Sequence, residues 1–154
     1  MRKLLTTFWF SLIVAHGFAQ CPAITREMLE NLMVLGPKKI EKQLVALGFV
    51  EEEVTISGIM ASYRTCPMMI DDSLKLGKSI DVFSGSPHGG VSYSTWDRAD
   101  YDAIRGSIES DSTFVLYQSL GDFMTEYRSS RCIVHFTDAD VWWIVQFLPA
   151  RTED

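Results

Sequence analysis

Two periodicities along the chain separate predicted helices from predicted strands. Apolar residues recur at three-to-four spacing in three segments, which is typical of helices with one buried side. Gly36 and Pro37 divide the first helix from the second, with glycine at the stop and proline in the next first turn. Asp97 is a good N-cap for the third helix. The predicted helices are residues 22–35, 37–47 and 98–110.

Between and after these helices the apolar period changes to two, which indicates strands. Glycine, proline, serine and aspartate gather between the strand segments, as turns require. Residues 66–77 are expected to form a loop, because they are polar and include a proline. The predicted strand segments are residues 54–56, 59–63, 79–83, 90–96, 113–119, 125–136 and 141–148.

These elements predict an α+β fold, with an antiparallel sheet of five or six strands packed against about three helices. A faint internal similarity suggests two tandem α-β-β-β units. Each half runs from a helix to a phenylalanine, Phe49 or Phe114, and then to Tyr63 or Tyr127, each followed by arginine. The alternative is chance similarity between two generic α+β stretches.

The first residues have the anatomy of a secretory signal peptide. Arg2 and Lys3 supply a positive start, and an apolar stretch of about twelve residues follows. Gly17 and Ala19 are the small residues that a cleavage site needs. We therefore predict a signal peptide over residues 1–19 and export from the cytoplasm.

The mature chain, residues 20–154, is expected to be one domain in the periplasm or the medium. A spanning helix needs about twenty apolar residues, so no transmembrane segment is expected there. A lipid anchor on Cys21 fits less well. Gln20 and Phe18 stand where a lipoprotein signal has a small and an aliphatic residue.

The charge of the chain limits the kinds of partner it can bind, and its cysteines indicate which disulfides it can form. The chain carries 14 basic and 20 acidic residues, and loss of residues 1–19 makes the balance more acidic. Nucleic acid is therefore an unsuitable partner, because such binding needs clustered lysine and arginine.

Cys21, Cys66 and Cys132 remain after cleavage. A disulfide between Cys66 and Cys132 ranks first, because the two occupy comparable places in the two halves; three idle thiols are the alternative.

Few residues suggest catalysis. Ser86 and His88 share one predicted bend near Asp81, which leaves open a small exported hydrolase with a loop-built site. The Gly-x-Ser-x-Gly pattern is not matched there. The mature chain has only His88 and His135, and no H-E-x-x-H motif. No metal or cofactor is predicted.

An aromatic strand surface is the most suggestive feature. Alternation places Trp142 and Ile144 on one face of the last strand, and Ile133 and His135 on the same face of the strand before it. If helices cover the opposite face, these side chains form an exposed recognition surface. The alternative is that a helix, a loop or another subunit covers both faces. The predicted binding surface is Trp142, Ile144, Ile133, His135, Tyr127 and Arg131.

Two resemblances accompany this interpretation. The signal ending Phe18-Ala19-Gln20, followed by a helix that runs through residues 44–49 (LVALGF) into strands, resembles small exported bacterial proteins of unknown function. The tandem helix-plus-sheet arrangement is loosely similar to β-lactamase-inhibitor-like proteins, in architecture only. Neither resemblance assigns a role to any residue.

The sequence thus favours a non-catalytic binding or interaction module that meets a protein or a small ligand outside the cytoplasm. The exported hydrolase is the first alternative. A self-associating envelope component is the second.

Overall fold

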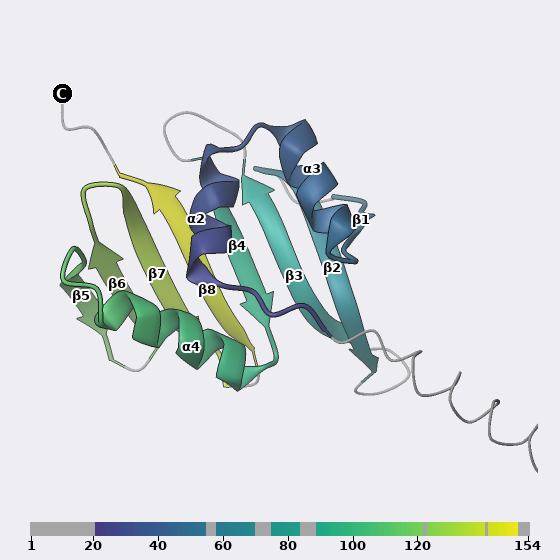
Figure 1. Cartoon of the computed structure of the whole chain (residues 1–154). Coiled ribbons are helices and arrows are strands. Elements are labelled where there is room, and N and C mark those ends of the chain that lie inside the picture. Colours follow the sequence, from purple (N-terminus) through teal and green to yellow (C-terminus); the bar gives the residue numbers. More distant parts are fainter. Residues whose placement is uncertain are drawn as a thin grey trace, which may run out of the picture.

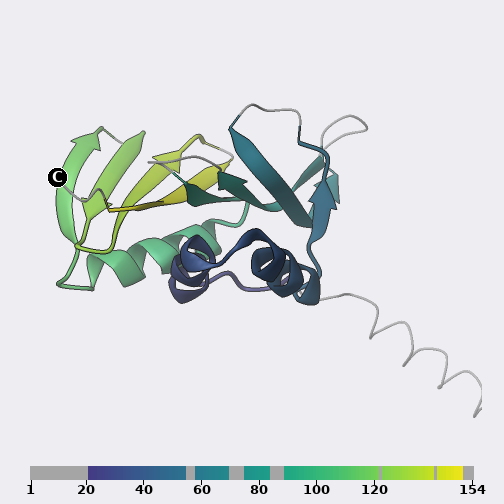
Figure 2. The same cartoon turned by 90° about the horizontal axis from the view of Figure 1, so that it is seen from above.

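The fold is a sheet with helices on one side. A computed structural model describes residues 21–54, 58–69, 75–83, 89–121, 123–140 and 142–150. Within these ranges, three helices pack against one face of an eight-stranded antiparallel sheet (Figure 1, Figure 2). The predicted signal peptide, residues 1–19, lies outside them. None of the helices in the described ranges has the length and apolarity needed to cross a membrane.

The sheet consists of two four-stranded meanders. The strand order is β1-β2-β3-β4-β8-β7-β6-β5, so the meanders meet where β4 pairs with β8. Each meander follows helical structure in the chain, and the first and last strands of the order form the two edges. The strands are β1 (Val50–Glu52), β2 (Ile59–Met69), β3 (Lys75–Phe83), β4 (Gly90–Thr95), β5 (Val115–Leu120), β6 (Met124–Arg128), β7 (Cys132–Asp138) and β8 (Trp143–Pro149).

The α+β class is confirmed, but the predicted sheet of five or six strands and the three-strand repeat units are wrong. The predicted strand over residues 125–136 is two strands, because the chain turns at Ser129, whose backbone N–H donates to the Cys132 carbonyl. The predicted loop over residues 66–77 is strand at 66–69 and 75–77, where β2 and β3 extend into it, and residues 70–74 fall outside the described ranges. The strand expected over residues 54–56 lies instead at β1, and residues 55–57 fall outside the described ranges.

The helices match the predicted segments closely. They are α2 (Arg26–Val34), α3 (Pro37–Ala46) and α4 (Arg98–Glu109). The Asp97 carboxylate accepts from the Ala99 N–H at 3.0 Å, as expected of an N-cap. Thr25 caps α2, so that helix begins four residues later than the predicted position 22. Gly48 follows α3 with φ +83°, the left-handed conformation in which glycine usually ends a helix.

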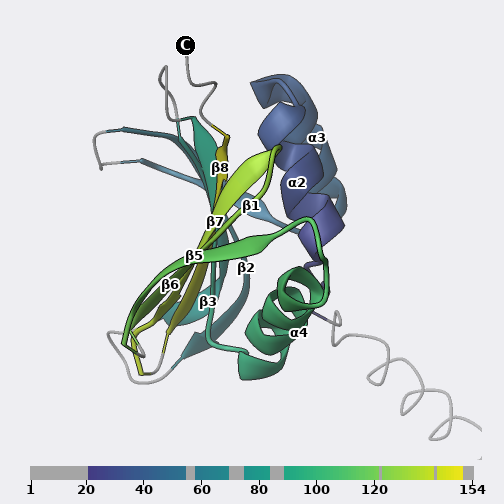
Figure 3. The same cartoon turned by 90° about the vertical axis from the view of Figure 1, so that its left-hand side faces the viewer.

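The core lies between the helices and the sheet. The inner strands contribute alternate residues, and each helix contributes its apolar stripe. Figure 3 shows the three helices on one side of the sheet and none on the other. The largest side chains with less than 2% exposure are Leu29, Leu32, Leu44, Ile80, Val91, Tyr93, Tyr101, Ile104, Ile108, Val134, Phe136 and Phe147.

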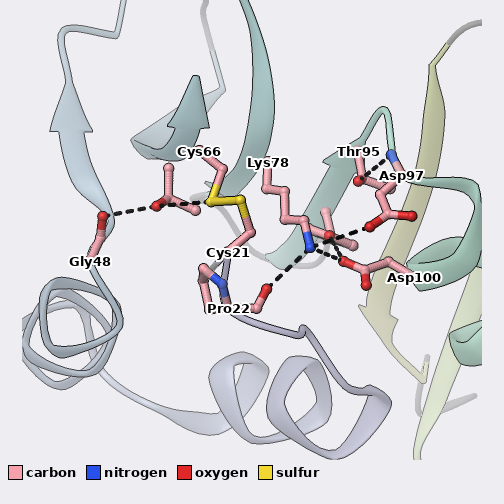
Figure 4. The surroundings of a disulfide bond; sticks show 10 residues. Cys21, Pro22, Gly48, Cys66, Lys78, Thr95, Asp97 and Asp100 are labelled. Atoms are coloured by element: carbon pink, nitrogen blue, oxygen red, sulfur yellow. Dashed lines mark hydrogen bonds and ion pairs between the residues drawn. A yellow bond between two sulfur atoms is a disulfide. The ribbon is translucent and has the colours of Figure 1, made fainter. Parts of the chain in front are cut away.

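The disulfide joins Cys21 to Cys66, and the predicted pairing of Cys66 with Cys132 is wrong. Three strands separate β2 from β7, which is about 19 Å at the usual strand spacing and far beyond disulfide reach. Cys66 sits instead at a bulge of β2 with φ +52°. There it meets the start of the described chain (Figure 4). Cys132 is a buried thiol in the core.

Candidate functional site

The face of the sheet opposite the helices, here called the open face, carries an unbroken polar row. The row can be followed through the register of each strand pair, because directly opposed residues share a face. It contains one residue from every strand. In spatial order these are Glu52, Ser62, Asp81, Ser92, Gln146, His135, Glu126 and Gln118.

One end of this row is a charged cluster. Nε2 of His135 lies 3.2 Å from Oε2 of Glu126, and the other oxygen of Glu126 accepts from Nε of Arg128. The Glu126 side chain is 10% exposed, whereas that of Arg128 is 43% exposed. The bond to Glu126 raises the pKa of Arg128. A nearly buried carboxylate therefore has two basic neighbours, and both stand at the surface of the open face.

The middle of the open face is lined by serines. Ser79 lies opposite Ser94, and Ser92 lies opposite Asp81. Ser79, Ser92 and Ser94 are buried although no described helix covers this face. At 2.6 Å, the Ser62 hydroxyl donates to the Asp81 carboxylate. This region offers hydroxyl and carboxylate groups close to the backbone of the sheet.

Apolar side chains flank the row on β7 and β8. Ile144 lies opposite Thr137, and Ile133 lies opposite Leu148. Ile133, Ile144 and Leu148 are each half-buried. The open face is therefore mixed in character, with a polar row bordered by aliphatic groups.

The structure brings together three of the predicted binding residues. Ile133, His135 and Ile144 lie on the open face of β7 and β8, as alternation predicts. Trp142 directly precedes β8 and is half-buried. The neighbouring indole of Trp143 lies on the other side, against Tyr101 of α4.

Two predicted binding residues lie on the helix side instead. The Tyr127 hydroxyl donates to Glu109 of α4 at 2.7 Å, and its ring meets Phe136 edge-on in the core. The Arg131 guanidinium is 3.5 Å from Glu30 of α2. Neither side chain is in line with His135, so the open face has a different composition from the predicted surface.

Of the polar row, only His135 belongs to the predicted binding surface, and the residues missing from that prediction are Glu52, Ser62, Asp81, Ser92, Gln146, Glu126 and Gln118. Alternation through β6 could have placed Glu126 and Arg128 on one face, had the turn before Cys132 been recognised. Ser92 and Gln146 are far apart in the chain and become neighbours only because β4 pairs with β8. No local signal in the sequence indicates that pairing.

The alternative hydrolase site is only partly described. Ser86 and His88 lie outside the described residues, and the third candidate, Asp81, is bonded to Ser62 in the polar row. Among the described residues, no group of three histidine, cysteine or acidic side chains is placed to hold a metal ion.

A second polar cluster lies on the helix side, next to the disulfide (Figure 4). Nζ of Lys78 is 2.5 Å from Oδ2 of Asp100 and 3.2 Å from the carbonyl oxygen of Pro22. It is also 3.8 Å from Asp97. The Lys78 side chain is only 3% exposed.

Tyr93 completes this cluster, since its hydroxyl donates to the same oxygen of Asp100 at 2.7 Å. Burial, reinforced by Asp100, raises the pKa of Tyr93. Lys78 donates to Asp100 and to the Pro22 carbonyl and has Asp97 as a second acidic neighbour, so the cluster ties the first residues, β3 and α4 together.

No protein-family model, curated protein or solved structure matches this chain.

Proposed function

We propose that the protein is a non-catalytic binding module that acts outside the cytoplasm and holds a partner protein on the open face of its sheet. The observation that carries the proposal is the polar row, which crosses all eight strands on the side without described helices. The uncovered face of an antiparallel sheet usually contacts only solvent. Here it combines a paired buried charge with half-buried aliphatic groups.

The dimensions favour a macromolecular partner. Eight strands at the usual spacing of about 4.8 Å give the row a length of about 34 Å. That length is comparable to a standard protein–protein interface and much longer than a small ligand.

The state of the strongest nucleophiles supports a non-catalytic role. Cys66 is held in the disulfide, and burial raises the pKa of the Cys132 thiol, which keeps it protonated and unreactive. Lys78 is buried and bonded to the Asp100 carboxylate and the Pro22 carbonyl. Within the described ranges, these groups serve the fold.

The disulfide also supports action outside the cytoplasm. Disulfides persist in oxidising compartments and are rare where thiol reductants are abundant. The Cys21–Cys66 bond lies immediately after the segment predicted to direct export. The disulfide and the predicted signal peptide therefore favour the same compartment, outside the cytoplasm.

Interface substitutions test the proposal. Ile144→Asp places a charge in the open face, and Val45→Asp places one at an exposed position of α3, where Val45 is 55% exposed. The purified proteins would be used to capture partners from an envelope extract, with folding checked by circular dichroism. We expect the wild type and the Val45→Asp variant to retain the same partner, and the Ile144→Asp variant to lose it.

Retention of that partner by a folded Ile144→Asp variant would contradict the proposal. A second variant, Gln146→Arg, separates loss of binding from loss of folding, because it keeps a polar residue within the row. If it too binds normally, the partner contacts another surface.

A further inference from the structure

The edge strand β5 is unusually exposed. Each of its six residues is exposed, and four of them are large and apolar. Phe123, just after the strand, is also exposed. The large apolar residues and their exposed fractions are Val115 at 66%, Leu116 at 55%, Tyr117 at 58% and Leu120 at 52%.

The backbone of β5 is unpaired on its outer side within the described chain. In the strand order β5 is terminal and pairs only with β6. An edge of this kind presents N–H and C=O groups that a further strand can pair with. The sequence VLYQSL contains no charge and no proline, which are the residues that usually block such pairing.

The opposite edge of the sheet is protected. β1 is three residues long and carries Glu51 and Glu52. Short length and charged side chains are both common protections of sheet edges. The two edges of one sheet therefore differ, and only β5 has the length and neutrality to accept another strand.

We propose that β5 pairs antiparallel with β5 of a second copy of this chain. The pairing would relate the two copies by a twofold axis and join their sheets into one, with both helix layers on the same side. Such an interface uses the same strand on both copies and closes at two. Head-to-tail growth into a filament would require β5 to pair with the short, acidic β1.

Charge favours a second copy at this edge. The chain has a net charge of −6, so two copies repel each other over most of their surface. On β5 no register of self-pairing opposes like charges, because the strand has none. On the adjacent strand, Glu126 and Arg128 neutralise each other.

Apolar contacts would add to the backbone pairing. Antiparallel self-pairing places Val115, Leu116 and Leu120 beside uncharged residues of the second copy, and such cross-strand pairs stabilise sheets. The contact would cover the apolar groups that β5 now exposes. This interface is independent of the open face, and it stands whether or not that face binds a partner.

Sedimentation of the purified protein tests the pairing. We expect the wild type to sediment as a dimer that dissociates on dilution, and Leu116→Lys to sediment as a monomer. Val34→Lys is the matched control, because Val34 is an apolar residue of α2 with 79% exposure. This control should remain dimeric. A wild type that is monomeric at every concentration, or a folded Leu116→Lys variant that still dimerises, would overturn the proposal.

Hydrogen exchange provides a second measurement that needs no variant. Amides of β5 that point away from β6 should exchange at least tenfold more slowly in concentrated than in dilute wild-type protein. Equal exchange at both concentrations would show that another surface holds the dimer, and the proposal would fail.

Discussion

Glu126 on β6 lies directly opposite His135 on β7, and Nε2 of His135 is 3.2 Å from Oε2 of Glu126. Arg128 donates to the other oxygen of the same carboxylate. The cluster thus places one nearly buried acid between two bases on the open face. A buried charge is tolerated only when it is paired, so Arg128 contributes to stability as well as to the charge pattern of the face.

Arg128→Gln should destabilise the protein by more than the loss of an ion pair between two exposed side chains, because it leaves the nearly buried Glu126 with one charged neighbour fewer. Arg98→Gln is the control. Arg98 is 52% exposed and pairs with Asp102 and Asp138, which are 53% and 29% exposed, so solvent reaches both pairs. We expect the control to cost less than about 1 kcal/mol. Urea unfolding of both variants measures the difference, and equal losses would show that burial of Glu126 does not strengthen the pair.

The contributions of Lys78 and Asp100 to the stability of the fold should be strongly coupled. Lys78→Met leaves the Asp100 carboxylate buried without its cation, and we expect a loss of about 3–5 kcal/mol. Adding Asp100→Asn removes the unpaired charge while keeping an acceptor for Tyr93. The double variant should therefore lose less unfolding free energy than the sum of the losses in the two single variants. Strict additivity in a double-mutant cycle would mean that the two groups do not interact.

The disulfide should stabilise the chain by about 2–4 kcal/mol, since it closes a segment with a sequence separation of 45 residues. Cys66→Ser and reduced wild type should have the same lowered free energy of unfolding. Adding reductant should not lower the free energy of unfolding of the Cys66→Ser variant any further. A thiol count on unfolded, unreduced wild type should give one thiol, Cys132. A count of three would show that the bond does not form.

The helices could be predicted from the sequence because their signals are local. Gly36 and Pro37 mark one boundary, and Asp97 caps the third helix as expected. The strand count could not be predicted in the same way. The turn at Ser129 interrupts what looks like one long strand, and the extension of β2 past Cys66 includes a bulge that breaks the alternation.

Only part of the candidate site could be predicted, for a related reason. Alternation within β7 and β8 places His135 and Ile144 on one face without any knowledge of the sheet. The same reasoning cannot show which strands are neighbours. The order β4-β8 brings Ser92 to Gln146, and the position of α4 buries Tyr127. Both depend on the tertiary fold.

Asp111 should make the protein sensitive to acid. Bonds from the backbone and the hydroxyl of Thr113, together with Arg26, lower the pKa of Asp111 to about 2. In the unfolded chain the pKa of an aspartate is about 3.9. The folded state therefore holds fewer protons at this group, so its contribution to stability is present above pH 4 and is lost as the pH falls toward 2.

The variant Asp111→Asn isolates this contribution. At pH 7 the variant should be less stable than the wild type, because it loses the ion pair with Arg26. As the pH falls from 4 to 2, the wild type should lose more stability than the variant, and the difference between them should narrow. Urea unfolding at pH 7, 4 and 2 measures this difference. A difference that stays constant over that range would mean that Asp111 has the same pKa in the folded and unfolded states.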